Sequence, residues 1–209
     1  MTKSSKSYHH GNLKQELILC ACRLCEEHGY ESLSMRSIAK ESGVSQTAPY
    51  RHFDTKESLY ACVAMEGFKK LSAATNIDIS KKVTKDNMVK TGINYINFGL
   101  GNANTYDLMF GTAVGDLSNY PDLLDCANGT YENMKLSFSK LAQDSEDVIA
   151  YKCITLWSML HGLVGILRKV AVVDNMDPEQ DHGPIKSASL IGANLDEHLD
   201  KVITGIIQS

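Results

Sequence analysis

The stretch SMRSIAKESGVSQTAPYRHFDTK, residues 34–56, decides the fold of the N-terminal part of this 209-residue chain. Ser34 is a natural N-cap, and the residues after it predict a short helix over Met35 to Glu41. Gly43 supplies the stop, and a second short helix is expected from about Ser45 to about His52. Two short helices joined by a glycine-bearing turn are typical of a helix-turn-helix unit, which projects the first residues of its second helix outward.

The second helix of this unit has side chains that suit DNA. A helix in the major groove brings small or hydrogen-bonding groups to base edges at its N-terminus, and its flanks carry phosphate ligands. The groups suited to base edges are Ser45, Gln46, Thr47 and Ala48. The groups suited to phosphate oxygens are the phenol of Tyr50, the imidazole of His52 and the ammonium of Lys56. Pro49 lies in the first turn, where its missing N–H costs least and its ring stiffens the chain.

An interpretation without DNA is open for the aromatic residues of this segment. Tyr50 and Phe53 are three residues apart, so either could close the small core of a three-helix unit. We expect Phe53 in that core, and His52 could be an ordinary surface residue. For Gln46, Tyr50 and Lys56 the combined pattern favours contact with DNA.

The composition is that of an ordinary globular protein, with 43% apolar and 22% charged residues. The net charge of −4 mildly opposes nucleic-acid binding by the chain as a whole. The charge is unevenly distributed, because residues 1–56 hold eight Lys or Arg against six Asp or Glu, whereas residues 57–209 hold thirteen against nineteen. The positive end of the chain is therefore the N-terminal one, at +2 against −6.

Neither a membrane span nor a secretory signal is predicted. The longest nearly apolar run, Cys153 to Leu167, has 15 residues and is too short to cross a bilayer. The N-terminal MTKSSKSYHHGNL lacks the apolar stretch of a signal peptide, so we expect a cytoplasmic location and six reduced cysteines. Cys22 and Cys25 form a CxxC, which could be a redox or metal pair, but a place in the core is favoured because no second pair accompanies them.

A period of 3.6 residues recurs along nearly the whole chain, so the sequence predicts an all-α fold. We expect a helix-turn-helix DNA-binding domain over residues 1–56 and a larger helical ligand-binding and dimerisation domain over residues 57–209. The polar stretch TNIDISKKVTKD, residues 75–86, is expected to follow a linking helix. Besides the two short helices, the predicted helices are Asn12–His28, Lys56–Ala74, Asp86–Gly101, Thr105–Gly111, Pro121–Gln143, Glu146–Val173 and Ile185–Ile207.

The first 70 or so residues resemble the DNA-binding domain of the TetR family of one-component transcriptional repressors. The resemblance is carried by YHHGNL at 8–13, SMRSIAKESGVS at 34–45, APYRHFDTKESLY at 48–60 and AMEGFKKL at 64–71. WSMLHG at 157–162 is similar to the motif of a subgroup named for Trp, His and Gly. The resemblance implies an all-helical regulator of about nine helices that binds a palindromic operator as a homodimer. The residues then expected to contact double-stranded DNA are Ser34, Arg36, Ser45, Gln46, Thr47, Ala48, Pro49, Tyr50, His52 and Lys56.

The last two predicted helices are the expected homodimer interface. The span from Ile154 to Val173 is apolar nearly all round, so it has to be covered on more than one face. On the final helix, a stripe at helical spacing is formed by Leu195, Leu199, Val202 and Ile206. Gly162 and Gly165 would let a partner helix approach closely, and a twofold copy would complete a four-helix bundle. The alternative is that these stripes only close the core of a monomer.

A small-molecule effector would bind in a mostly apolar pocket of the larger domain that carries a few polar groups. The candidate ligand-binding residues are Tyr95, Phe98, Tyr106, Met109, Phe110, Met134, Phe138, Trp157 and His161. Aromatic residues at helical spacing are more often core than pocket, so each of them taken alone could be a core residue. Trp157 and His161 lie four residues apart on one helix face and could be a hydrogen-bonded core pair.

The predicted function is a sequence-specific DNA-binding transcriptional regulator, a repressor released from a palindromic operator when a small molecule binds the C-terminal domain. No cofactor, metal site, membrane association or enzymatic activity is expected. The alternative is a helical small-molecule-binding protein or enzyme that does not bind DNA. The sequence lacks the GxSxG, GxxxxGK[ST], HExxH and GxGxxG patterns, and an enzyme built on the larger domain would leave the N-terminal domain unexplained.

Overall fold

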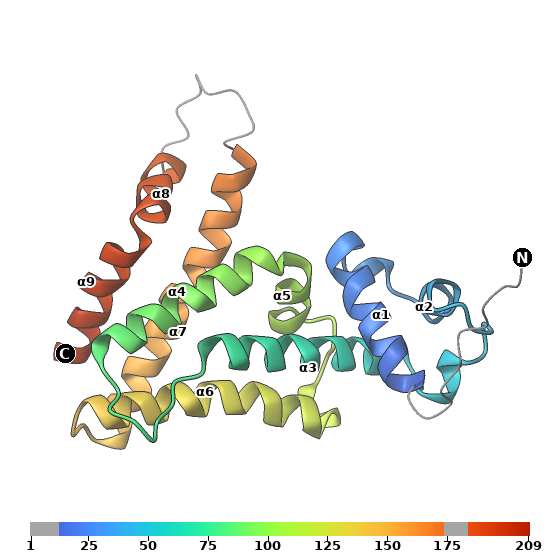
Figure 1. The fold of residues 1–209 in the computed structure, drawn as a ribbon, viewed down its shortest axis with the longest axis horizontal. Coiled ribbons are helices and arrows are strands. Elements are labelled where there is room, and N and C mark those ends of the chain that lie inside the picture. The colour runs from blue at the N-terminus through green and yellow to red at the C-terminus, as the bar shows by residue number, and fades with distance from the viewer. Residues whose placement is uncertain (1–12, 174–183) are drawn as a thin grey trace, which may run out of the picture. The chain divides into compact units, whose positions relative to one another are not determined.

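The computed structural model describes residues 13–173 and 184–209 (Figure 1). Tyr8 to Asn12, which include the expected cap of the first helix, lie outside the described residues. Within the described ranges the regular structure is entirely helical, which confirms the all-α prediction. The α-helices are α1 (Leu13–His28), α2 (Met35–Glu41), α3 (Lys56–Thr75), α4 (Lys85–Gly101), α5 (Ala103–Phe110), α6 (Pro121–Leu141), α7 (Glu146–Val173), α8 (Pro184–Ala193) and α9 (Leu195–Gln208). Three short 3₁₀ helices are η1 (Tyr30–Ser32), η2 (Pro49–Arg51) and η3 (Leu117–Asn119).

The chain divides into two compact units. The first unit contains the residues up to Gly67 together with Asn104–Leu124, and the second contains Phe68–Ala103 and Asp125–Ser209. This division falls inside α3 and is a division by packing. The boundary expected after residue 56 separates a DNA-binding domain from a ligand-binding and dimerisation domain, and it stays a prediction.

The core of the first unit is formed by α1, α2, α3 and the segment between α2 and α3. Leu17, Ile38, Phe53 and Leu59 are fully buried there, and burial of each contributes about 1.5–3 kcal/mol. Phe53 therefore belongs to the core, as expected. Gly67 is required where α3 passes α5, because a Cβ at this position would overlap the side chain of Met109.

Both ends of α2 are fixed by local hydrogen bonds. At its start, the backbone N–H of Ser37 donates to Ser34 Oγ at 3.0 Å, and the backbone N–H of Ser34 donates to Ser37 Oγ at 2.9 Å. At its end, Gly43 has φ +67° and the backbone N–H of Val44 donates to the carbonyl of Ala39 at 3.0 Å, which is a Schellman motif. The predicted bounds of this helix, Met35 to Glu41, are confirmed.

The second helix of the predicted helix-turn-helix is not an α-helix. In place of the expected helix from Ser45 to His52, the chain forms a turn followed by the 3₁₀ helix η2. The cause lies at Pro49, which has no N–H to donate to the carbonyl of Ser45. That carbonyl accepts instead from the N–H of Ala48 at 3.0 Å, so the segment begins with the tighter i to i+3 pattern.

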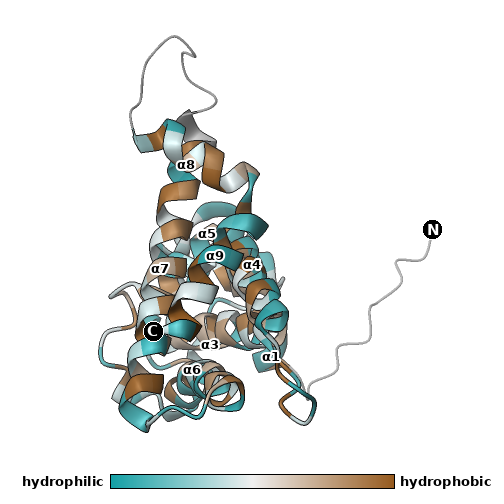
Figure 2. Ribbon diagram, turned by 90° about the vertical axis from the view of Figure 1, so that its left-hand side faces the viewer, coloured by the Kyte–Doolittle hydropathy of each residue, from teal (hydrophilic) through white to brown (hydrophobic). Residues whose placement is uncertain are grey.

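In the second unit, α4 contacts both α7 and α9. Gly92 lies at this crossing, since a Cβ there would lie 3.2 Å from Leu199 and 3.4 Å from Leu160. Hydrophobic residues recur along α7 and α9 (brown in Figure 2). Leu199 and Ile206, from the stripe expected at the dimer interface, are buried inside the chain itself. For these two residues the alternative is correct, because they close the core of one copy.

The last predicted helix, Ile185 to Ile207, is divided into α8 and α9, so the prediction of one continuous helix is wrong. Asn194 lies at the break with φ −128° and ψ 41°, outside the α region. Its side-chain Nδ2 donates to the carbonyl of Leu190 at 3.0 Å, and its backbone N–H donates to the carbonyl of Ile191. The asparagine side chain thus bonds a carbonyl of the preceding turn, which explains the break.

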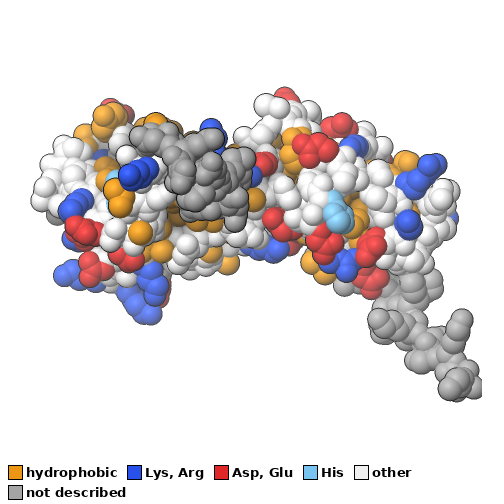
Figure 3. Space-filling model, turned by 90° about the horizontal axis from the view of Figure 1, so that it is seen from above, with side chains coloured by type: hydrophobic (Ala, Val, Ile, Leu, Met, Phe, Trp, Pro, Cys, Tyr) orange, Lys and Arg blue, Asp and Glu red, His pale blue; other side chains and the backbone are white. Residues whose placement is uncertain are grey.

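The helix α7 has the predicted bounds, Glu146–Val173, and extends beyond the apolar run from Cys153 to Leu167 at both ends. By length and composition alone, Glu146–Val170 could cross a membrane, a property shared by core helices of soluble proteins. Lys152 within it is buried, forms an ion pair with Asp144 at 2.9 Å, and donates to the carbonyl of Ile207 at 2.8 Å. On the face that Figure 3 shows, charged side chains of both signs are interspersed.

Candidate nucleic-acid interface

Most residues predicted to contact DNA lie on the surface of the first unit, on α2 and on the segment that joins it to α3. The exposed ones are Arg36, Ser45, Gln46, Thr47, Tyr50 and Lys56, and the half-buried ones are Ser34 and His52. Tyr50 is 61% exposed, although an aromatic ring normally stabilises a protein by burial. Packing within the unit therefore does not explain this tyrosine, and its phenol is available to a ligand.

Ala48 and Pro49 do not face solvent, which corrects the prediction that they face DNA. Ala48 is 9% exposed, and Pro49 is buried at the start of η2. Their side chains hold the turn against the core of the first unit. Of the four residues predicted to meet base edges, Ser45, Gln46 and Thr47 are exposed, and the hydroxyls of Ser45 and Thr47 lie 3.3 Å apart.

The ammonium group of Lys56 has a defined position at the start of α3. Its Nζ donates to the carbonyl of Glu31 at 3.2 Å and lies 5.1 Å from the centre of the Tyr60 ring. Tyr60 is itself fixed, because its hydroxyl donates to the carbonyl of Tyr30 at 2.8 Å. The backbone N–H of Ser58 donates to Thr55 Oγ1 at 3.1 Å, so Thr55 caps α3.

Two exposed cations of this surface escaped the sequence analysis. Arg51 ends η2, and Lys40 lies one helical turn after Arg36 on α2. Arg51 lies in the sequence between Tyr50 and His52, which were both predicted to contact phosphates, and this position could have identified it. Its guanidinium group is always charged and suits bidentate contact with a phosphate.

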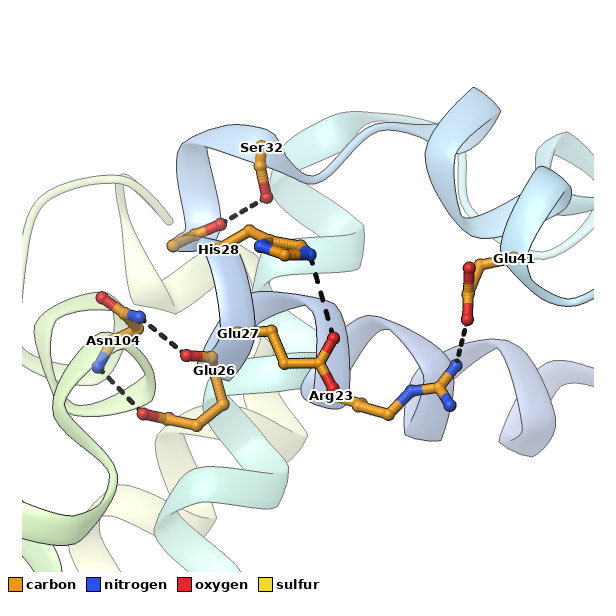
Figure 4. A network of polar contacts seen from close by, with 8 residues as sticks. Arg23, Glu26, Glu27, His28, Ser32, Glu41 and Asn104 are labelled. Atoms are coloured by element: carbon orange, nitrogen blue, oxygen red, sulfur yellow. Dashed lines mark hydrogen bonds and ion pairs between the residues drawn. The ribbon is translucent and has the colours of Figure 1, made fainter.

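The helix α1 ties these elements together within the first unit (Figure 4). The guanidinium of Arg23 bonds the carboxylate of Glu41, at the end of α2, at 2.8 Å. Glu26 of α1 meets the start of α5, where its carboxylate accepts from the hydroxyl of Thr105 at 2.8 Å and its carbonyl accepts from Asn104 Nδ2 at 2.8 Å. Helix α1 therefore connects the segment that carries the exposed residues to α5.

The nine predicted ligand-binding residues are distributed over both units. Tyr106, Met109 and Phe110 belong to the first unit, where the rings of Tyr106 and Phe110 are 4.6 Å apart. The other six belong to the second unit, and they are Tyr95, Phe98, Met134, Phe138, Trp157 and His161. Trp157 Nε1 donates to the hydroxyl of Tyr95 at 3.1 Å, and the rings of Trp157 and His161 are 6.2 Å apart. A common pocket for all nine stays a prediction.

None of the cysteines in the described residues forms a disulfide, as expected. Burial raises the pKa of Cys25 to about 12 and that of Cys153 to about 11. Cys25 therefore stays protonated at neutral pH. The other cysteine of the CxxC, Cys22, is half-buried, whereas Cys25 is buried. Among the residues that the structure describes, no group of three or more His, Cys, Asp or Glu side chains could hold a metal ion.

Residues 17–63 match the family described as bacterial regulatory proteins, tetR family. The HTH-type transcriptional repressor AcnR of Corynebacterium glutamicum is 38% identical over 55 residues, which cover 26% of this chain and 29% of that repressor. The match to this curated relative thus spans less than a third of its length. The match to the family therefore covers most of α1, all of α2 and the first part of α3, in the N-terminal part of the chain.

Solved structures of similar fold extend over nearly the whole chain. A TetR variant from Acinetobacter baumannii AYE, solved in complex with minocycline, has a TM-score of 0.63 at 18% identity and covers 97% of this chain and 98% of its own. BioQ, solved with its double-stranded DNA operator, has a TM-score of 0.60 at 16% identity and covers 94% and 98%. At these identities the likeness establishes a common fold.

Proposed function

We propose that this chain is a sequence-specific DNA-binding transcriptional regulator of the TetR type. The observation that carries the proposal is the exposed segment from Ser45 to Lys56, which presents hydroxyl, amide, phenol and ammonium groups beside a capped α2. These groups suit base edges and phosphates. The match of residues 17–63 to the family supports the proposal, and so does the fold that the chain shares with an operator-bound structure.

Repression is the proposed mode of action, because the matched relative is named as a repressor. A small molecule would bind the larger helical domain and favour a state in which the two DNA-binding parts of a dimer no longer match successive major grooves, about 34 Å apart. Similarity to a structure with bound minocycline supports such a ligand. We also propose membership of the Trp-His-Gly subgroup, on the basis of Trp157, His161 and Gly162.

The proposed homodimer forms through the outward faces of α7 and α8. Tyr151 on α7 and Leu190 on α8 are both 66% exposed, and Ile154 and Ile166 continue the exposed apolar face of α7. Gly162 of α7 lies in the same face, with open space where a Cβ would be, so a partner helix could approach closely. A second copy would remove this apolar surface from water, and a twofold axis suits a palindromic operator.

The test is binding of the purified full-length chain to the DNA that flanks its own gene, measured by fluorescence anisotropy against a shuffled duplex of equal length. We expect tighter binding to the flanking DNA, with an affinity that falls as salt rises because phosphate contacts release counterions. Equal, weak binding to both duplexes at every salt concentration would reject the proposal. The alternative, a helical ligand-binding protein or enzyme without DNA binding, would then be favoured.

A further inference from the structure

The loop between α3 and α4 and the first half of α4 line a cavity of about 320 Å³ in the second unit. None of the nine residues predicted to bind an effector lines it. The loop contributes the apolar side chain of Ile77 and the charged side chains of Asp78, Lys81 and Lys82. Helix α4 contributes Asn87, Lys90, Thr91 and Asn94. These four are spaced so that they lie on one face of the helix.

The lining is basic in an otherwise acidic part of the chain. Three lysines line the cavity against one aspartate, whereas residues 57–209 carry an excess of acidic residues. Asp78 is already engaged, because its carboxylate accepts from the backbone N–H of Ser80 at 3.1 Å and pairs with Lys81 at 3.0 Å. The positive charge of Lys81 is therefore balanced within the loop.

Lys82 and Lys90 are the unbalanced cations of this cavity. Both are exposed, and neither has a carboxylate within ion-pair distance among the described residues. One comes from the loop and the other from α4, so two separate elements each contribute a lysine to the lining of the cavity. Two like charges at one site repel each other and are stabilised by a counter-ion of opposite charge.

Neutral donors accompany the two lysines. The Oδ1 atom of Asn87 accepts from the backbone N–H of Thr84 at 3.0 Å, which identifies that atom as the oxygen and leaves the amide NH₂ to donate elsewhere. The hydroxyl of Thr91 also lines the cavity. Asn94 braces the site, because its Nδ2 donates to the carbonyl of Ala74 at the end of α3 at 2.8 Å. The α3 end and α4 are thus held together by a bond that needs no ligand.

We propose that this cavity binds a small oxyanion with two negative charges, such as a phosphate monoester or a dicarboxylate. The ammonium groups of Lys82 and Lys90 would balance its charge, and Asn87 and Thr91 would donate hydrogen bonds to its oxygens. The cavity volume lies at the lower end of the range for small-molecule sites, about 300–1,000 Å³, which suits a small ligand.

The test is isothermal titration calorimetry of the full-length chain with inorganic phosphate and, separately, with succinate, at an ionic strength kept constant with sodium chloride. We expect saturable binding of at least one anion. The double variant Lys82→Gln/Lys90→Gln should weaken it about tenfold, since two exposed ion pairs are lost. The matched control is Lys140→Gln/Lys186→Gln, which removes two exposed lysines that do not line the cavity. It should bind as tightly as the unaltered chain.

Each result decides for or against the site. Binding of phosphate alone assigns a phosphate-bearing ligand, and binding of succinate alone assigns a dicarboxylate. Lack of saturable binding of both anions overturns the proposal, and so does equal weakening in the two double variants, because general surface charge would then be the cause. The titration contains no DNA, so its failure leaves the proposed regulator function intact.

Discussion

Tyr50 and Gln46 lie on the same exposed segment but differ in what they can recognise. A phenol hydroxyl reaches a phosphate oxygen, which is present in every sequence, whereas a side-chain amide can pair with the edge of one base. We therefore expect Tyr50→Phe to weaken binding to operator and random DNA alike by about 0.5–1.5 kcal/mol. Gln46→Ala should change the preference at one base-pair position by about 1–3 kcal/mol. Anisotropy titrations on single-substitution operators measure both effects.

The control for these variants is Tyr151→Phe, which removes the hydroxyl of another exposed tyrosine, in the second unit. It should leave DNA affinity unchanged. If Tyr50→Phe and Gln46→Ala lowered affinity equally on specific and random DNA, the assignment of separate roles to the two residues would be wrong.

The buried thiols make a second prediction at the residue scale. Because burial raises the pKa of Cys25 to about 12 and of Cys153 to about 11, both stay protonated at pH 8 and react slowly with iodoacetamide. The half-buried Cys22, Cys62 and Cys126 should be alkylated first. Peptide mass spectrometry after brief labelling measures the order. Labelling of Cys25 as fast as Cys22 in the folded chain would contradict this account.

The same pKa shifts fix the direction of a pH effect. Above about pH 9 the unfolded chain loses thiol protons that the folded chain retains. The contribution of Cys25 and Cys153 to stability is therefore complete below that pH and is lost as the pH rises toward their folded pKa values.

At the candidate nucleic-acid interface, side-chain chemistry predicted which residues are exposed, except at two positions. The polar residues Ser45, Gln46 and Thr47 are exposed, as their place after a glycine turn suggested. Ala48 and Pro49 are buried, and their sequence neighbours gave no sign of it. Burial depends on which way a two-residue turn faces, and the hydrogen-bond pattern that Pro49 imposes decides that direction.

At the scale of elements, Gly43 and Gly129 make a matched pair. A Cβ at either position would meet no atom within 4 Å, but Gly43 has φ +67° in the Schellman motif whereas Gly129 lies inside α6. Gly43→Ala should lower the free energy of unfolding by about 1 kcal/mol, because an L residue is strained there. Gly129→Ala should raise it by about 0.5–1 kcal/mol through helix propensity. Urea denaturation measures both.

The prediction depends on the opposite signs of the two changes in the free energy of unfolding. Any general effect of adding a methyl group would act in the same direction at both positions. Stabilisation by Gly43→Ala would show that α2 does not end in the left-handed residue described above.

The ends of a helix could be predicted from the sequence where a residue caps the helix. They could not be predicted where a side chain interrupts the helix. The cap at Ser34 and the stop at Gly43 fixed α2 to the residue. The break at Asn194 was missed, because an asparagine on an apolar-periodic helix can point to solvent or bond the preceding turn, and the period is the same in both cases. Tertiary packing of α9 on α4 decides between them.

For the whole molecule, the exposed faces of α7 and α8 predict how the chain assembles. Ile154→Asp together with Leu190→Asp puts two charges into apolar surface that a second copy would cover. We expect the double variant to be monomeric by size-exclusion chromatography with light scattering, while its circular dichroism spectrum stays unchanged. Its affinity for a palindromic operator should fall by at least about tenfold, since the second half-site is no longer held.

The control is Leu136→Asp on α6, which charges a similarly exposed leucine of a helix that is not part of the proposed interface. It should remain dimeric. Dissociation by both changes would point to general destabilisation, and dimerisation of the double variant would show that another surface joins the two copies.

Which faces of the last helices point outward could not be read from the sequence. The stripe of Leu199 and Ile206 has the spacing of an interface, but it closes the core of its own chain against α4. A helix that is apolar nearly all round, such as α7, has two faces to bury, and periodicity does not assign either to a partner. That assignment needed the positions of α4, α8 and α9.

Burial of Pro49 limits how well one copy of the chain could distinguish its operator from other chromosomal DNA. With Ala48 and Pro49 inside, three side chains remain for base edges, and a wrong base pair costs about 1–3 kcal/mol. One copy would then discriminate by roughly 3–9 kcal/mol, whereas about 10⁶ competing positions demand about 8 kcal/mol. Two copies together would discriminate by roughly 6–18 kcal/mol, which exceeds that demand over most of the range. Promoter occupancy would accordingly grow with the square of the amount of free chain at low abundance, so modest changes in expression would act as a steep control.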